Sequence, residues 1–358
     1  MYLLKYKDSI VLKFDTKNRY VELISKDLLP YSIANMKVSY DMISKFCSDR
    51  ILMMNRQYCK EILNSCDIDD QSDINICITG KALSFRDNYW ICKEDSKELW
   101  CNVNLYNNKF SSELEYISLT GDMSKVVLTD DLFTGELTNK GTRAKCFHRE
   151  SDKLFLIKNE SLDEIRSEII TFYLASALGL RCSQYSYGRI NNLDCSICQI
   201  FTSEEFELIP CRDIMSYHNE FKLYFNCNTY NTFYNIGRLD FLKMQLLDYI
   251  VLNTDRNRDN FGLCKRNGVL IGLYPIFDHD SCFKGKRTKA NYFPSGLSFT
   301  DTLFNIKLKY HNEMIILRPC IENFKNYIST PQFKDLFLSY KSEEVYNSVL
   351  RRTNNILN

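Results

Sequence analysis

The sequence predicts an α+β protein. Strand-like alternation with turn residues marks residues 2–24 and 153–158, whereas helical periodicity marks residues 161–179 and 238–251. Hydrophobic residues make up 45% of the 358 positions and charged residues 25%, which is globular composition. Gly and Pro number only 12 and 6, too few for a long disordered tail. The length corresponds to roughly two to three domains.

The charge balance bears on the class of partner. Lys and Arg total 46 against 45 Asp and Glu, so the formal net charge is only +1. A general binder of nucleic-acid backbones would carry a large positive excess, so we expect no direct nucleic-acid partner. The charge-free runs 169–180 and 223–237 are too short or too rich in Asn to span a membrane, and the first residues lack the pattern of a signal peptide. We expect a cytoplasmic protein without a membrane partner.

The cysteines favour a structural reading. An odd total of 15 cannot pair completely within the chain, and in a large cytoplasmic protein most should be buried thiols. Cys195 and Cys198 have the CxxC spacing of a zinc ligand pair, but no second pair stands at a matching distance. Apolar neighbours at 197 and 200 favour a buried strand.

The chain opens with three expected strands at residues 2–4, 10–14 and 20–24, separated by polar turns. Apolar residues three or four positions apart then predict helix from residue 40 to 64. Residues 80–118 combine aromatic and turn residues, which indicates a small mixed unit and not a linker.

The next strand, residues 153–158, ends in Lys158. A helix follows, because Ser161 and Glu164 form a capping box, and Gly179 suits its left-handed end. Glu168 falls within the apolar stripe of this helix. A buried carboxylate needs a cationic partner, for which Lys158 is the nearest candidate; alternatively, Glu168 reaches solvent at the edge of the stripe.

Residues 238–251 form a helix that is apolar on two faces, so it should be buried, and eight polar residues, 253–260, follow it. Asn267 and Gly268 then predict a type I′ hairpin turn. With the turn centred there, Asn260 pairs with about Pro275, and Asp278 lies three residues further along. Asn260 and Asp278 should therefore meet at the open end of the hairpin.

Asp255, Asn260 and Asp278 would converge as oxygen donors, the kind of ligand that Mg²⁺ prefers. Phosphoryl-transfer kinases use the same order along the chain: an Asp, an Asn five residues later, a hairpin and then a second Asp. There the first Asp aligns or deprotonates the attacking hydroxyl, and the other two residues hold Mg²⁺ on the nucleotide. Each residue alone could be a turn or cap residue, but the ordered combination favours function.

Over roughly residues 125–300 the sequence resembles the HipA-like serine/threonine kinases. Residues 255–262, Asp-Arg-Asn-Arg-Asp-Asn-Phe-Gly, look like that family's Asp-Arg-His-x-x-Asn segment followed by Phe-Gly, and residues 275–278 look like its metal-binding stretch. The resemblance implies that Asp255 is the catalytic aspartate and that Asn260 and Asp278 bind Mg²⁺. One departure is Asn257, which stands where the family has His.

The resemblance extends to the region before the catalytic segment. It implies that Lys158 is the strand lysine that contacts phosphate. It also implies that the helix with Ser167, Glu168 and residues 177–180 carries the glutamate that pairs with this lysine, at Glu168. This favours a buried Glu168 over a solvated one. Residues 83–90, Leu-Ser-Phe-Arg-Asp-Asn-Tyr-Trp, are similar to Firmicutes-type members that carry an N-terminal extension.

Two further segments are candidates for nucleotide contacts. Gly141 and Thr142 stand where the family's phosphate-covering loop should lie, although this loop has a single glycine. Gln199 and Phe201 follow a strand-like run at the place of the segment joining the two lobes, whose backbone would bind adenine. A buried strand is the structural alternative, and the two readings are compatible.

The resemblance implies a bilobal protein-kinase-like fold of the HipA type with an accessory α+β domain. We expect this accessory domain at residues 1–120, a small kinase lobe at 121–205, and a large, mainly helical lobe at 206–358. The expected activity is ATP- and Mg²⁺-dependent phosphorylation of Ser or Thr hydroxyls in a protein substrate. Ser or Thr residues of this chain itself are among the expected substrates. The family suggests a toxin or signalling role with an antitoxin or regulatory protein as partner. The alternatives are a small-molecule or lipid phosphotransferase, and a weakly active nucleotide-binding pseudokinase that acts as an interaction module.

Overall fold

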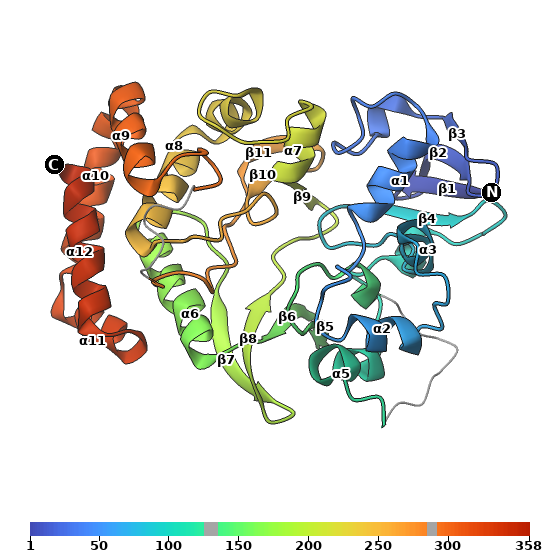
Figure 1. Ribbon diagram of the computed structural model, residues 1–358, viewed down its shortest axis with the longest axis horizontal. Helices are drawn as coiled ribbons and strands as arrows, with labels where there is room; N and C mark the ends of the chain where they lie inside the picture. Colours follow the sequence, from blue (N-terminus) through green and yellow to red (C-terminus); the bar gives the residue numbers. More distant parts are fainter. Residues whose placement is uncertain (125–134, 285–291) are drawn as a thin grey trace. The chain divides into compact units, whose positions relative to one another are not determined.

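A computed structural model describes residues 1–124, 135–284 and 292–358 of the chain (Figure 1). The described residues form two compact units. Unit 1 comprises Met1–Glu160 and Gly188–Glu207, and unit 2 comprises Ser161–Tyr187 and Leu208–Asn358. The helix that follows Ser161 therefore groups with the C-terminal residues. The three domains expected from the sequence, 1–120, 121–205 and 206–358, remain a prediction.

Unit 1 begins with a four-stranded antiparallel sheet in the order β3-β2-β1-β4. Its strands are β1 (Tyr2–Tyr6), β2 (Ser9–Asp15), β3 (Tyr20–Leu23) and β4 (Tyr89–Lys93). The three predicted N-terminal strands are confirmed, and β4, from the segment 80–118, completes the sheet. This segment is thus part of a folded unit, as its composition predicts.

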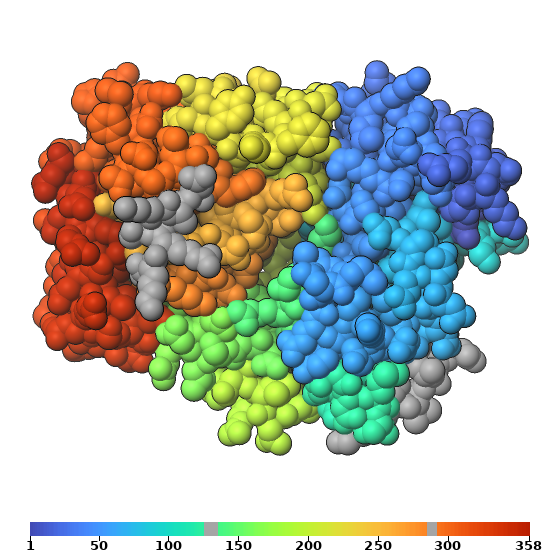
Figure 2. All heavy atoms as spheres, in the orientation of Figure 1, coloured from blue at the N-terminus to red at the C-terminus, as the bar shows by residue number. Residues whose placement is uncertain are grey.

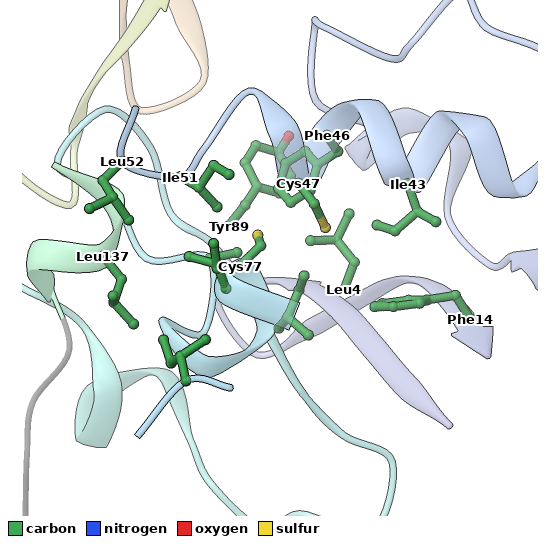
Figure 3. Close-up of a cluster of buried hydrophobic side chains, with 14 of the residues drawn as sticks. Leu4, Phe14, Ile43, Phe46, Cys47, Ile51, Leu52, Cys77, Tyr89 and Leu137 are labelled. Atoms are coloured by element: carbon green, nitrogen blue, oxygen red, sulfur yellow. The ribbon is translucent and has the colours of Figure 1, made fainter. Parts of the chain in front are cut away.

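Short helices accompany this sheet. They are the 3₁₀ helices η1 (Lys26–Leu28) and η2 (Gly135–Thr138) and the α-helices α1 (Tyr40–Ser48), α2 (Cys59–Ser65), α3 (Asp73–Thr79), α4 (Trp100–Val103) and α5 (Ser112–Thr120). Figure 3 shows their shared core, in which Leu4 and Phe14 of the sheet meet Ile43 and Phe46 of α1. In Figure 2, residues 1–120, coloured blue to green-blue, present one continuous surface.

The helix predicted over residues 40–64 is wrong in its middle, because residues 49–58 are not helical between α1 and α2. Arg50 explains the interruption. Its guanidinium binds both carboxylate oxygens of Asp87, at 2.6 and 2.8 Å, and donates to the Ala82 carbonyl at 2.9 Å. Side-chain bonds to distant residues hold the chain out of the helix that local periodicity favours.

The second sheet has the order β5-β6-β8-β7 and belongs to unit 1 except for the first three residues of β7. Its strands are β5 (Lys145–Glu150), β6 (Lys153–Asn159), β7 (Tyr185–Ile190) and β8 (Leu193–Gln199). The predicted strand ending in Lys158 is confirmed. Cys195 and Cys198 are buried on β8, as the strand reading predicts, and in the described part of the chain all 15 cysteines are free thiols, most of them buried.

Unit 2 opens with α6 (Leu162–Ala177), whose predicted capping box between Ser161 and Glu164 is present at its start. The helix ends at Ala177, with Leu178 as its C-cap, and Gly179 follows in the left-handed region at φ 65°. A three-stranded sheet, β11-β10-β9, then accompanies helices α7 and α8. The bounds are β9 (Phe206–Pro210), β10 (Gly262–Arg266), β11 (Val269–Leu273), α7 (Cys211–Tyr217) and α8 (Asn228–Val251).

Helix α8 starts ten residues earlier than the apolar pattern from Arg238 indicates, and it bends at Gly237, where the backbone leaves the helical region. Its first part is rich in Asn, a poor helix former, which hides it in the sequence. The part from Phe241 to Val251 is buried on both faces, as predicted.

Four C-terminal helices complete unit 2, with α12 beside α10 (Figure 1). They are α9 (Phe299–Lys309), α10 (His311–Ile328), α11 (Pro331–Tyr340) and α12 (Glu343–Leu357). Among the helices in the described ranges, none combines the length and apolar character needed to cross a membrane.

Candidate functional site

The polar octet 253–260 forms a tight loop at the C-terminal end of α8. The helix closes with Leu252 in the left-handed conformation, at φ 50°. The buried Asn253 side chain then accepts the Asp255 backbone N–H at 3.1 Å and donates to Asp248 at 3.2 Å. The end of a buried helix thus fixes the backbone on which Asp255 stands.

The predicted hairpin follows this loop. Asn267 and Gly268 have φ values of 48° and 80°, as a type I′ turn requires, and Arg266 pairs with Val269. A bulge shifts the register by one residue between Cys264 and Lys265, so that Leu263 pairs with Leu273. The bulge brings the segment after β11 one residue closer to the loop 253–260 than an unbroken ladder would.

The hairpin brings Asn260 and Asp278 together, as the register argument predicts. The Asn260 side-chain amide donates to the Asp278 carboxylate at 2.9 Å and to the Asp255 backbone carbonyl at 3.1 Å. Asp278 itself has φ 65°, a left-handed conformation that is strained for Asp, and its backbone N–H donates to the Tyr185 hydroxyl at 3.3 Å. The loop and the hairpin end form one polar cluster in unit 2.

Asp255 lies at the exposed edge of this cluster. Partial desolvation of its carboxylate, and then the negative charges of Asp278 and Asp280, raise its pKa above the ordinary aspartate value. The Asn257 amide opposes this rise with a long 3.5 Å hydrogen bond to the same carboxylate. A carboxylate with a raised pKa that stands beside further carboxylates suits a base that takes up a proton during a reaction.

Asn257, the departure from the resembled family, has a defined place in the loop. Its side-chain oxygen accepts the Asp259 backbone N–H at 2.9 Å, while its backbone N–H donates to the Asp255 carbonyl at 2.7 Å. These bonds keep Asp255 and Asn260 at opposite ends of a single turn. The carboxamide therefore supports the loop without an imidazole.

Arg256 is a buried residue of the candidate site whose contacts the sequence did not indicate. It stands inside the polar octet but is only 1% exposed. Its guanidinium holds both carboxylate oxygens of Asp248 at 3.0 Å, and it donates to the carbonyls of Asn260 at 2.9 Å and Phe277 at 3.0 Å. One side chain thus joins α8 to the loop 253–260 and to the residue before Asp278.

The fifth donor of Arg256 points at His279, the residue after Asp278. Arg256 Nη2 lies 2.9 Å from His279 Nε2, and because a guanidinium only donates, Nε2 must be the acceptor. The neutral ring then carries its proton on Nδ1, which lies 3.5 Å from a carboxylate oxygen of Glu168. That same oxygen accepts the His279 backbone N–H at 2.7 Å.

Glu168 is therefore not a surface residue. Its side chain is fully buried, so the alternative in which it reaches solvent is wrong. In unit 2 it anchors the backbone directly after Asp278 to helix α6. The sequence pointed to a buried role for Glu168, but its partner His279 lies 111 residues away and has no local signal.

Lys158 belongs to unit 1, where it is 6% exposed at the end of β6. Its ammonium lies 3.3 Å from Glu160, a buried carboxylate that also accepts a hydrogen bond from the Ser196 hydroxyl. Glu160 is a partner that the sequence did not indicate. The proposed pairing of Lys158 with Glu168 joins residues of different units and remains a prediction.

Gly141 and Thr142 lie in the loop that enters β5, at the end of the strand where Lys145 pairs with Lys158. The Ala144 carbonyl in the same loop accepts the Asn159 backbone N–H at 2.9 Å. Gly141 has φ 113°, a backbone conformation that residues with a Cβ rarely adopt. The loop therefore needs this glycine, and it lies at the Lys158 end of the sheet.

Gln199 ends β8, where it pairs with Phe155, and Phe201 follows in the segment that leads to β9. The Phe201 ring packs edge-to-face against Phe206, with ring centroids 6.4 Å apart. Both residues thus lie in unit 1 at the exit from the second sheet. Their role as an adenine-contacting segment remains a prediction.

The donor set at the cluster of unit 2 fits Mg²⁺. Asp278 offers a carboxylate and Asn260 a side-chain amide oxygen, hard ligands that suit a cation which also binds phosphate oxygens and water. Within residues 1–124, 135–284 and 292–358, no three His, Cys, Asp or Glu side chains are grouped to share a metal ion. Asn260 and Asp278 would thus bind a metal ion together with oxygens of the nucleotide, and would not form a metal site made of protein ligands alone.

The chain has the mixed α/β fold of the HipA-like kinases. It aligns over 100% of its length with 96% of HipA from Shewanella oneidensis MR-1, in a solved toxin–antitoxin complex of HipA with HipB and operator DNA, at a TM-score of 0.63 and 11% identity. The predicted fold class is thereby confirmed.

A second solved structure, the Helicobacter pylori proinflammatory kinase CtkA, aligns with 59% of this chain and 89% of its own, at a TM-score of 0.40 and 16% identity. No family model matches the sequence, and no curated protein matches it by sequence. The likeness is thus one of fold.

Proposed function

We propose that this chain is an ATP- and Mg²⁺-dependent phosphotransferase acting on Ser or Thr hydroxyls of a protein. The observation that carries the proposal is the Asn260 amide 2.9 Å from the Asp278 carboxylate, on the loop that bears Asp255. This order of groups in a fold like that of a kinase supports phosphoryl transfer over a set of unrelated turn residues. The fold alone would not assign an activity.

The residues divide the chemistry among them. Asp255 would align the attacking hydroxyl and accept its proton, as its raised pKa favours. The hydroxyl oxygen would form a bond to the γ-phosphorus while the bond from that phosphorus to the β–γ bridging oxygen breaks, and ADP would leave with the electron pair. When bound through Asn260 and Asp278, Mg²⁺ would neutralise charge on the phosphates.

The residues of unit 1 would serve the nucleotide. Lys158 would contact a phosphate, with the loop of Gly141 and Thr142 nearby at the same end of the sheet. The segment with Gln199 and Phe201 would hold the adenine. A regulatory or antitoxin-like protein is the proposed partner, which is supported by the complex of the neighbour HipA with HipB.

A pseudokinase is the second candidate, because Asn257 replaces the family's His. A carboxamide cannot titrate near neutral pH, so a chemical role of the imidazole would be lost. The hydrogen bonds of Asn257 within the loop favour the active enzyme, since they keep the turn intact. If Asn257→His turned an inactive protein into an active one, the pseudokinase would be the correct reading.

The direct test is to incubate the purified chain with γ-labelled ATP and Mg²⁺, with and without cell lysate, and to locate the label by mass spectrometry. We expect label on Ser or Thr of the chain or of a lysate protein, and none when EDTA removes Mg²⁺. Label on a small molecule or lipid would change the substrate class. Binding of ATP without transfer in any fraction would contradict the proposed activity.

A further inference from the structure

Arg56 in the N-terminal part of unit 1 is buried and holds the loop that enters β5. The side chain is only 3% exposed. Its guanidinium donates to the Asn139 carbonyl at 2.9 Å and to the Lys145 carbonyl, so it binds both ends of residues 139–145. It also pairs with the buried Glu136 carboxylate at 3.4 Å. Gly141 and Thr142 lie between the two carbonyls.

Backbone bonds reinforce this attachment. The Gln57 N–H donates to the Thr142 carbonyl at 2.8 Å, and the Leu52 N–H donates to the Leu137 carbonyl at 2.7 Å. Glu136 in turn accepts the Phe147 N–H of β5 at 2.6 Å. The stretch between α1 and α2, which local periodicity would make helical, instead follows the loop along its length.

A second attachment holds the segment after β8. The Glu204 carboxylate accepts the Trp100 indole N–H at 2.7 Å and the Asn107 amide at 3.1 Å, while its carbonyl accepts the Asn88 amide at 3.0 Å. The Tyr6 hydroxyl donates to Glu207 at 2.6 Å. Residues between 6 and 107 therefore hold the middle and the end of the segment 200–207 that follows β8.

We propose that residues 1–120 are a brace for the nucleotide site, in which Arg56 positions the loop 139–145 and Trp100 positions the segment 200–207. The inference rests on the proposed function, because these are the two segments of unit 1 assigned to phosphate and adenine. Neither Arg56 nor Trp100 touches the reacting atoms. Both act through the loops that they hold, so the brace sets nucleotide affinity and leaves the chemical step to Asp255.

The test measures the dissociation constant of Mg-ATP by calorimetry at a temperature well below unfolding. Arg56→Lys keeps the positive charge but loses the guanidinium whose two Nη groups reach both carbonyls. The dissociation constant of Mg-ATP should then rise about tenfold, as expected for the loss of one or two hydrogen bonds. Trp100→Phe keeps a six-membered aromatic ring but loses the indole N–H that bonds to Glu204 and part of the buried ring, so a rise of about threefold is expected. In both variants kcat should change less than KM.

Arg19→Lys is the matched control, because Arg19 pairs with Asp41 at 3.4 Å on the surface of the same unit, with a side chain that is 68% exposed. It should bind Mg-ATP as the wild type does. Amide hydrogen exchange provides the second readout: Arg56→Lys should speed exchange within residues 139–145 without a matching change across the other strands.

The outcomes separate the two proposals. If the wild type binds Mg-ATP and both brace variants bind equally well, the brace is wrong while the proposed function stands. If the wild type binds no Mg-ATP, the proposed function fails, and the exchange data still decide whether Arg56 holds the loop. Unchanged exchange at residues 139–145 in Arg56→Lys would overturn the brace in either case.

Discussion

Arg256 in unit 2 and Arg56 in unit 1 are both buried and both hold a loop, but their carboxylate partners bind them differently. Arg256 grips both oxygens of Asp248 at 3.0 Å, whereas Arg56 reaches one oxygen of Glu136 at 3.4 Å. Burial lowers the pKa of Arg256, but Asp248 more than offsets it and the pKa lies above its ordinary value. For Arg56, burial outweighs Glu136 and the pKa is lowered.

In the Arg56–Glu136 pair, burial also has a larger effect than the partner's charge on the pKa of the carboxylate. Burial raises the pKa of Glu136 despite the charge of Arg56 and the hydrogen bonds that it accepts. A buried ion pair stabilises a fold only when geometry and extra hydrogen bonds repay desolvation. Asp248 gains such bonds from Tyr292 at 2.6 Å and Asn253 at 3.2 Å. The comparison thus predicts a rigid loop 253–260 in unit 2 and a more adjustable loop 139–145 in unit 1.

The largest expected effect is on stability. Arg256→Met leaves Asp248 buried without its cation, which should cost about 3–5 kcal/mol in the free energy of unfolding. Arg56→Met should cost less, about 1–3 kcal/mol, because Glu136 can take up a proton and keep its other hydrogen bonds. Urea denaturation of both variants at neutral pH checks the difference. An Arg56 variant that loses as much stability as the Arg256 variant would break the comparison.

Asp255→Asn keeps the size of the side chain but removes the carboxylate that accepts the proton. Turnover should fall at least ~100-fold while Mg-ATP affinity changes little. The matched control is Asp259→Asn in the same loop, whose carboxylate pairs with Arg212 at 3.0 Å and should leave turnover within a few-fold of wild type. Retained phosphorylation in Asp255→Asn would mean that the loop has another role.

The sequence anticipated the parts of this site that local chemistry determines. The turn residues Asn267 and Gly268 set the hairpin, and the hairpin sets the meeting of Asn260 and Asp278. The capping box set the start of α6. In these cases the residues that decide the geometry are neighbours in the chain.

The buried arginines were not predictable for the opposite reason. Arg256 stands among seven other polar residues, and a long polar run indicates an exposed loop unless distant carbonyls and carboxylates are known to surround it. Arg56 and Glu136 are 80 residues apart. The bulge beside Cys264 likewise follows from packing and not from the turn. Tertiary hydrogen bonds of this kind leave no periodic signal in a single sequence.

The two units are linked in the proposed mechanism through Lys158 and Glu168. If the lysine joins the glutamate to the nucleotide phosphates, a double-mutant cycle of Lys158→Met and Glu168→Gln should show coupling of roughly 1–3 kcal/mol in ATP affinity. Additive effects would leave Glu168 solely as the anchor of His279. Strong coupling without any transfer would instead support the pseudokinase.

The smallest expected effect concerns pH. Asp255 acts as a base only when its carboxylate is deprotonated, and its pKa is raised. As the pH is lowered, kcat/KM should therefore begin to fall at a pH above about 3.9, which is the ordinary pKa of Asp. Asp280→Asn removes one of the charges that raise this pKa, so the acid limb of the pH profile should move to lower pH. Asp259→Asn again serves as the control and should keep the wild-type limb. A limb that is unmoved in Asp280→Asn would exclude Asp255 as the titrating base.

Asn260 and Asp278 are proposed to form one site for Mg²⁺ on a nucleotide, and calorimetric titration with ATP in the presence and absence of Mg²⁺ tests this proposal. Wild type should bind ATP more tightly with Mg²⁺, Asp278→Ala should lose that gain, and Asn260→Ala should lose part of it, because a carboxylate is the stronger ligand. Variants that bind Mg-ATP as tightly as the wild type would contradict the claim.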